Sequence, residues 1–327
     1  MLENFRIPIG EWGAVAVDWI RDNLKALLDV ISTVVQTLVD GLADALNAPP
    51  AVVMIIVFAL IAWVFRSWQL AVGTVLMFTV IVGVDQWETS MQTLALVLVA
   101  AIVTVIIAVP VGIWAARNNT VSAIVKPVLD FMQTMPSLVY LIPVIVFFGV
   151  GFVPGVIATV IFSLPPGVRL TELGIRGVDA ETVEAGQAFG ARPGQVLVGI
   201  QLPQAAPTIM AGINQVIMLA LSMAVIAGMA GADGLGKEVV AALSTINVAL
   251  GVEAGLGVVL IAVYLDRVTA ALGTPSEYRW SLLGILSRAR ATRRVNAAAA
   301  ATAPSEAAAA DAEQRIAVGP KRNPGPF

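Results

Sequence analysis

Long runs of apolar residues constrain this chain more than any other feature of its sequence. About 20 helical residues cross a bilayer core of about 30 Å. Seven stretches approach or reach this requirement, some of them marginally, and they cover residues 50–66, 68–84, 90–115, 132–150, 152–166, 206–230 and 250–272. The chain is 58% hydrophobic and 13% charged, whereas soluble domains are about 25% charged. The sequence therefore predicts an all-α, polytopic membrane bundle of about seven helices. Because only residues 149–151 separate the fourth and fifth stretches, one of these two could be a short, irregular helix.

The two ends of the chain differ from this apolar middle. In residues 1–49, large apolar side chains such as Trp12 and Trp19 recur at helical spacing, with charged residues such as Asp18 and Asp22 between them. This pattern predicts an amphipathic helix rather than a span, lying on the membrane surface or against the rest of the protein. The acidic residues also argue against a signal peptide. Residues 276–327 become rich in alanine and proline and are predicted to form a largely disordered tail.

The distribution of basic residues predicts the orientation of the chain in the membrane. Cytoplasmic loops carry an excess of lysine and arginine. With the N-terminus outside and the C-terminus in the cytoplasm, the basic residues between the predicted spans fall inside, namely Arg66, Arg117, Lys126, Arg169, Arg176 and Arg192. Asp85, Glu88, Lys237 and Glu238 then lie outside. The opposite orientation would place almost every basic cluster on the wrong side.

Several kinds of catalytic chemistry are missing from the sequence. The chain has no cysteine and no histidine, which excludes thiolate metal sites, cysteine nucleophiles and imidazole acid–base catalysis. Residues 231–237 match the phosphate-loop pattern GxxxxGK, but Glu238 follows where a nucleotide site needs serine or threonine. We interpret this stretch as a turn between spans. The sequence thus predicts a non-catalytic protein that binds no metal, cofactor or nucleic acid and is surrounded by lipid.

Residues 167–205 form the one long polar stretch between late spans. Pro165 and Pro166 are expected to end the preceding helix. Asp179 is a suitable N-cap for a helix that runs through Phe189 and is closed by Gly190. Small residues in this helix leave room for close packing, and Phe189 offers one large apolar side chain. The pattern favours a docking element on the cytoplasmic face, and an ordinary connecting loop is the alternative.

The same stretch resembles a known motif. Glu184-Ala185-Gly186, then Gly190, then Ile200-Gln201-Leu202-Pro203 is similar to the EAA motif of ABC importer permeases, from which it departs at Gly186, where alanine is usual. Residues 184–227 resemble the glycine betaine/proline (quaternary amine) branch of this family, and the likeness extends over about residues 50–275. The resemblance implies a fold like that of a type I ABC importer permease, with residues 167–205 as the coupling loop.

The resemblance also implies function and partners. The chain would be the inner-membrane permease of an importer for compatible solutes such as glycine betaine, proline or choline. Two copies of a separate ATPase subunit would use ATP and magnesium, and an extracytoplasmic binding protein would deliver the solute to a permease homodimer. The residues that would dock on the ATPase are Glu184, Ala185, Gly186, Phe189 and Gly190.

Residues within the predicted spans are candidates for the translocation path. They are Gln133, Thr134, Ser137, Asn214, Gln215, Ser222 and Met223. Polar side chains in a membrane are costly and often functional, but they can equally form hydrogen bonds between helices, and methionine often only fills a core. A standalone secondary transporter or channel is the alternative function. It would be expected to show inverted repeats or a charged residue in the middle of a span, and neither is clear in this sequence.

Overall fold

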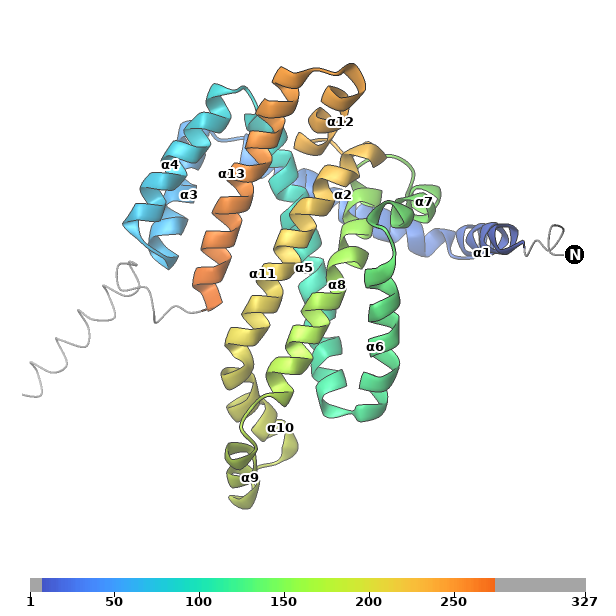
Figure 1. The fold of residues 1–327 in the computed structure, drawn as a ribbon, viewed down its shortest axis with the longest axis vertical. Coiled ribbons are helices and arrows are strands. Elements are labelled where there is room, and N and C mark those ends of the chain that lie inside the picture. The colour runs from blue at the N-terminus through green and yellow to red at the C-terminus, as the bar shows by residue number, and fades with distance from the viewer. Residues whose placement is uncertain (1–7, 274–327) are drawn as a thin grey trace, which may run out of the picture.

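The structure, a computed structural model, describes residues 8–273, and within that range the chain forms helices and no strand (Figure 1). The helices are α1 (Ile9–Asn23), α2 (Lys25–Asn47), α3 (Ala51–Phe65), α4 (Trp68–Gly83), α5 (Trp87–Arg117), α6 (Asn119–Thr134), α7 (Ser137–Phe148), α8 (Phe152–Arg176), α9 (Ala180–Ala188), α10 (Pro193–Val196), the π-helix η1 (Leu197–Gln201), α11 (Leu202–Ala227), the 3₁₀-helix η2 (Gly228–Ala230), α12 (Leu235–Thr245) and α13 (Val248–Gly273). The tail predicted at residues 276–327 lies outside the described range.

The predicted all-α membrane bundle is confirmed. Among the described residues, five segments are long and apolar enough to cross a membrane: α2, α5, α8, α13, and the continuous segment of residues 193–230 that contains α11. A sixth is possible because α6 and α7 together form a span that is bent by 98° at residues 135–136. The fourth predicted span, residues 132–150, thus contains only the end of α6, the break and the 12-residue helix α7, which is the short helix that the sequence allowed for. Helices α3 and α4 match the first two predicted spans closely, but they are only 15 and 16 residues long.

The N-terminal segment forms two helices, as its helical spacing of apolar residues predicted. By length and composition alone, α2 would also qualify as a membrane span, which the sequence pattern of residues 1–49 did not suggest. One stripe of α2, which includes Val35 and Val39, is buried in the main core together with side chains of α5. Val34 and Leu38 are about half exposed on other faces. The buried stripe shows that α2 packs against the rest of the protein, which is one of the two placements predicted for this amphipathic segment.

Helix α8 continues past the two prolines that were predicted to end its helix. Pro165 and Pro166 lie inside a helix that ends only at Arg176. Each proline removes one backbone N–H donor, but transmembrane helices tolerate this because neighbouring helices and hydroxyl side chains compensate. Here both prolines are buried among neighbouring helices. The polar stretch between spans is consequently shorter than residues 167–205.

The centre of the molecule is a three-helix unit in which α8 lies between α5 and α11 (Figure 1). Glycines line its crossings. A Cβ atom on Gly112 of α5 would lie 2.5 Å from Thr171 Cβ of α8, and one on Gly212 of α11 would lie 2.9 Å from Leu170 Cβ. A Cβ atom on Gly155 of α8 would likewise lie 2.8 Å from Ala227 Cβ. Small residues at such crossings let membrane helices approach closely.

The remaining helices surround this unit. An aromatic cluster of Phe58, Phe78, Trp87 and Tyr264 joins α3, α4, α5 and α13. Figure 1 shows α9 and α10 projecting from one end of the bundle, near the turn between α5 and α6, whereas α7 and α12 lie toward the other end. The α9–α10 segment is thus carried at the tip of the central unit.

Candidate functional site

The segment between α8 and α11 forms the helix–turn–helix that the sequence predicted. Asp179 caps α9 by accepting a hydrogen bond from the backbone N–H of Glu181 at 3.0 Å. Gly190 ends it with a φ of +81°, a conformation that favours glycine. The backbone N–H of Ala191 then donates to the carbonyl oxygen of Gly186 at 3.1 Å. The local sequence chemistry thus defines a short helix that begins and ends sharply.

Gly186 allows α9 to pack closely on η1. A Cβ atom at this position would lie 2.5 Å from Cδ1 of Ile200, and its next neighbour would be Cγ2 of Val196 at 3.8 Å. Ile200 belongs to the second part of the same motif. Glycine in place of the usual alanine is therefore matched to a long side chain opposite it.

The outer surface of α9 is open. None of the nine residues of α9 is buried, and the adjoining Phe189 is 93% exposed. Glu184 and Ala185 are also exposed. An aromatic ring in water at the tip of a capped, rigid turn is typical of a contact residue for another protein. The structure thus brings together all five residues that were predicted to dock.

A cleft of about 640 Å³ separates α9 from the rest of the bundle. Arg117 at the end of α5 and Arg176 at the end of α8 line one side, and Glu184 and Gln187 of α9 line the other. The exposed helix is therefore attached to the bundle mainly through its two ends and through the contact of Gly186 with Ile200.

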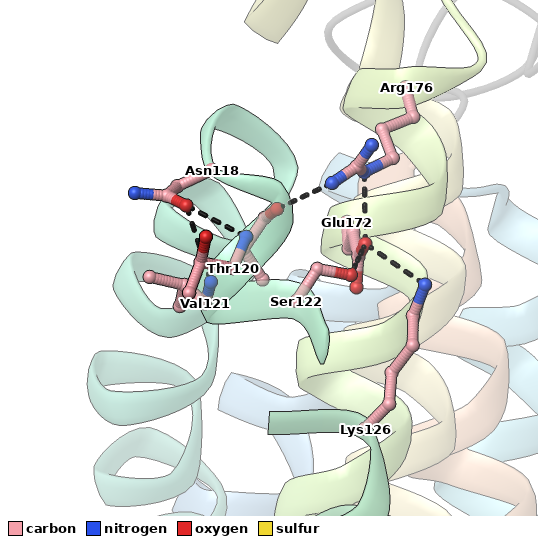
Figure 2. A network of polar contacts seen from close by, with 8 residues as sticks. Asn118, Thr120, Val121, Ser122, Lys126, Glu172 and Arg176 are labelled. Carbon is pink, nitrogen blue, oxygen red and sulfur yellow. Dashed lines mark hydrogen bonds and ion pairs between the residues drawn. The ribbon is translucent and has the colours of Figure 1, made fainter. Parts of the chain in front are cut away.

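A cluster of four polar residues, which was not predicted from the sequence, borders this cleft through Arg176 (Figure 2). We call Ser122, Lys126, Glu172 and Arg176 the Glu172 cluster. One carboxylate oxygen of Glu172 accepts a hydrogen bond from Ser122 Oγ at 2.7 Å and lies 2.9 Å from Arg176 Nε and 3.3 Å from Lys126 Nζ. Arg176 also donates from Nη2 to the carbonyl oxygen of Ala115 at 2.8 Å.

The Glu172 cluster joins three helices. Ser122 and Lys126 come from α6, Glu172 and Arg176 come from α8, and the carbonyl acceptor belongs to α5. Glu172 is only 4% exposed, so its charge depends on these partners. The sequence signal was the spacing of four residues within each pair, which places both members on one helix face. The partnership between the two faces became visible only in the fold.

The predicted path residues fall in two regions. Gln133 and Thr134 are exposed at the end of α6, and Ser137 is half-buried at the start of α7, so these three flank the 98° break. Gln215 and Ser222 are exposed on α11, and Met223 is fully buried. The structure therefore places polar side chains on an open face of α11 and at the broken helix.

Asn214 makes contacts between helices. Its Nδ2 donates to Asp266 Oδ1 of α13 at 3.1 Å, and its Oδ1 accepts a short hydrogen bond from Thr269 Oγ1 of the same helix. Of the two roles open from sequence, the structure displays the interhelical hydrogen bond for this residue.

The stretch that matches a phosphate loop is a tight turn. Gly231 and Gly234 have φ values of +79° and +119°. The backbone N–H of Leu235 donates to Thr93 Oγ1 of α5 at 2.8 Å, and Lys237 Nζ pairs with Asp233 at 2.6 Å. The amide and the ammonium group that would face a phosphate are thus engaged within the chain, as expected for a turn between helices.

These features define a polytopic helical membrane protein with an exposed, capped helix at one end. Comparison with known proteins identifies the family: the binding-protein-dependent transport system inner membrane components match residues 108–274. The chain belongs to this family. It is therefore a multi-pass inner-membrane transport permease, and the standalone carrier is not favoured.

Similar proteins cover most of the chain. The glycine betaine transport system permease protein OpuAB of Bacillus subtilis is 46% identical over 84% of this chain and 97% of its own length. The glycine betaine/proline betaine permease ProW of Escherichia coli is 44% identical over 84% of this chain and 77% of its own length. The glycine betaine/carnitine permease GbuB of Listeria monocytogenes is 46% identical over 83% of this chain and 97% of its own length.

A solved structure shares the fold. A chain of the MetNI methionine ABC transporter in an inward-facing conformation superposes with a TM-score of 0.53 at 19% identity, covering 57% of this chain and 94% of that one. The predicted architecture of an ABC importer permease is confirmed at the level of the fold.

Proposed function

We propose that this chain is the membrane permease of an ATP-driven importer for glycine betaine and related quaternary amines, and that α9 docks on a separate ATPase subunit. The observation that carries the docking role is the exposed, capped α9 with Phe189 at its end. The names of the similar permeases, which all include glycine betaine, support the substrate class.

The two ends of the bundle support the predicted orientation. Arg117, Arg176 and Arg192 lie at the ends of helices beside α9, whereas Asp85 and Glu88 lie at the opposite end, where α4 joins α5. The excess of arginine marks the α9 end as cytoplasmic. The N-terminal segment is then extracytoplasmic, and the tail is cytoplasmic.

In the proposed transporter, this chain has no catalytic role. Two ATPase subunits bind and hydrolyse ATP with magnesium, and an extracytoplasmic binding protein presents the solute to a pair of permease chains. Glu184, Ala185, Gly186, Phe189 and Gly190 form the contact with the ATPase. Movement of α9 on ATP binding shifts the bundle between two conformations.

The path for the solute is proposed to run along the open face of α11 and the break between α6 and α7. Gln215 and Ser222 face it from α11, and Gln133, Thr134 and Ser137 face it from the break. Asn214 and Met223 support this face from the protein side, since one is bonded to α13 and the other is buried.

Removal of the Phe189 side chain tests the docking role. Phe189→Ala should weaken association with the ATPase by about 2 kcal/mol or more, which is about 30-fold, because buried aromatic residues dominate such interfaces. Leu243→Ala is the matched control, since Leu243 is 74% exposed on α12 at the other end. Phe189 is a better position for this test than Gly190, because any side chain at Gly190 would strain a backbone with positive φ.

The measurement combines co-purification with uptake of labelled glycine betaine into vesicles that hold the permease, its ATPase and its binding protein. We expect uptake that requires ATP and is lost in Phe189→Ala but retained in Leu243→Ala. Uptake by the permease alone would instead reveal a standalone carrier. Equal ATPase association of both variants with the wild type would overturn the docking assignment.

A further inference from the structure

We propose that Glu172 is a positioning residue for transport, because its carboxylate fastens α6 to the turn of α8 through which movements of α9 enter the bundle. This inference rests on the proposed function. It concerns a residue outside the docking helix and outside the proposed path.

Helix α6 has few other attachments. Only Ser122 and Leu129 are buried among its 16 residues. Ile124, Val128 and Phe131 are each more than half exposed. Leu129 packs in a small apolar cluster with residues of α5 and α8, and Ser122 is bound to Glu172. The Glu172 cluster is therefore the buried polar part of the attachment of α6 to the central unit.

The same carboxylate holds the end of α8. Arg176, the last residue of α8, pairs with Glu172 one turn earlier and reaches across to the carbonyl oxygen of Ala115 in α5. Because a carboxylate so little exposed has lost its hydration, its three donors set where the surrounding helices lie. Figure 2 shows these side chains converging from α6 and α8 on a single carboxylate oxygen.

Only three residues, at positions 177–179, separate Arg176 from α9. A displacement of α9 by a bound partner is therefore applied first to the turn of α8 that contains the Glu172 cluster. Through Ser122 and Lys126 it reaches α6, which leads to the 98° break and to α7. Without the carboxylate, α8 could move while α6 stayed behind.

Glu172→Gln is the direct test. The amide keeps an acceptor for Ser122 but loses the charge that holds Lys126 and Arg176. In vesicles with the ATPase and binding protein, we expect normal ATPase association and ATP hydrolysis, but about tenfold fewer solute molecules imported per ATP, within the usual range of coupling between sites. A role confined to folding would lower uptake and hydrolysis together and leave their ratio unchanged.

Asp130→Asn is the matched control. Asp130 is a second carboxylate that pairs α6 with α8, through Arg169, but its side chain is 65% exposed. Exposed ion pairs contribute little, so this variant should import as much solute per ATP as the wild type. If Glu172→Gln does not fold, Lys126→Gln replaces it, because the Lys126 side chain is 56% exposed and can be changed with little loss of packing.

A reversible bridge provides the second measurement. Because the chain has no cysteine, Ser122→Cys/Glu172→Cys can be joined selectively by a short bifunctional thiol reagent. We expect low import per ATP before bridging, recovery after it, and renewed loss on reduction. The proposal is overturned if bridging does not change the amount of solute imported per ATP. It is also overturned if this ratio stays at the wild-type value in Glu172→Gln and Lys126→Gln. A wild-type complex that moves no solute with ATP would refute the proposed function itself.

Discussion

Restoring the usual alanine at position 186 should reveal how tightly α9 is fitted to η1. In Gly186→Ala, the new Cβ would lie 2.5 Å from Cδ1 of Ile200, the far end of a flexible side chain. Ile200 must leave its preferred rotamer, which costs about 0.5–1.5 kcal/mol. Alanine in place of glycine inside a helix contributes about 0.8–1.0 kcal/mol in the opposite direction. The two effects nearly cancel, so the single variant should change the local stability of α9 little.

The clash becomes measurable when its other partner is shortened. Ile200→Val removes Cδ1, so Gly186→Ala in that background should gain the full helical preference of alanine, about 1 kcal/mol. Hydrogen exchange of the amides of residues 180–190 reports this local free energy. We expect exchange to slow about fivefold between Ile200→Val and the double variant, and to change less than about twofold between the wild type and Gly186→Ala.

Gly194→Ala supplies the control for this experiment. A Cβ atom at Gly194 would meet no atom within 4 Å, so its effect should be the same with Ile200 or valine at position 200. If Gly186→Ala slows exchange equally in both backgrounds, the close approach of α9 to η1 is not a constraint, and the explanation of the glycine fails.

Two further predictions concern the bundle. Gly112→Ala should destabilise the protein by about 1–3 kcal/mol, because its Cβ would lie 2.8 Å from the backbone carbonyl oxygen of Val168. Thermal unfolding in detergent should show a lower Tm, whereas Gly73→Ala, whose Cβ meets no atom within 4 Å inside α4, should keep the Tm or raise it slightly. Thr93→Val should cost about 1–3 kcal/mol by leaving the buried N–H of Leu235 without an acceptor, and an unchanged Tm in this variant would contradict the role given to that hydrogen bond.

Local chemistry made the docking helix predictable. A suitable N-cap at Asp179 and a glycine at position 190 placed the ends of α9 to within one residue. The spans at α11 and α13 were equally accessible because their apolar runs are long. In these segments, the residue types themselves indicate where a helix begins, ends or is buried, without knowledge of distant partners.

The end of α8 was not predictable in the same way. Prolines at positions 165 and 166 indicated a helix break. The charged residues that follow, Arg169, Glu172 and Arg176, are typical of a loop between membrane spans. In the fold, α6 supplies partners for two of these charges: Asp130 pairs with Arg169, and Ser122 and Lys126 bind Glu172. Such partners are about 40–50 positions away in the sequence, so their compensation could not be seen from local patterns.

The glycine crossings of α5, α8 and α11 have a consequence for how the protein changes shape. Where a glycine lies directly against the Cβ atom of a neighbouring helix, no long side chain stands between the two helices to adopt a second arrangement. The three helices are then expected to move as one rigid body that carries α9 at its end. In the proposed transport cycle, opening and closing of the path would then fall to segments outside this unit, such as α7 beyond the break at residues 135–136.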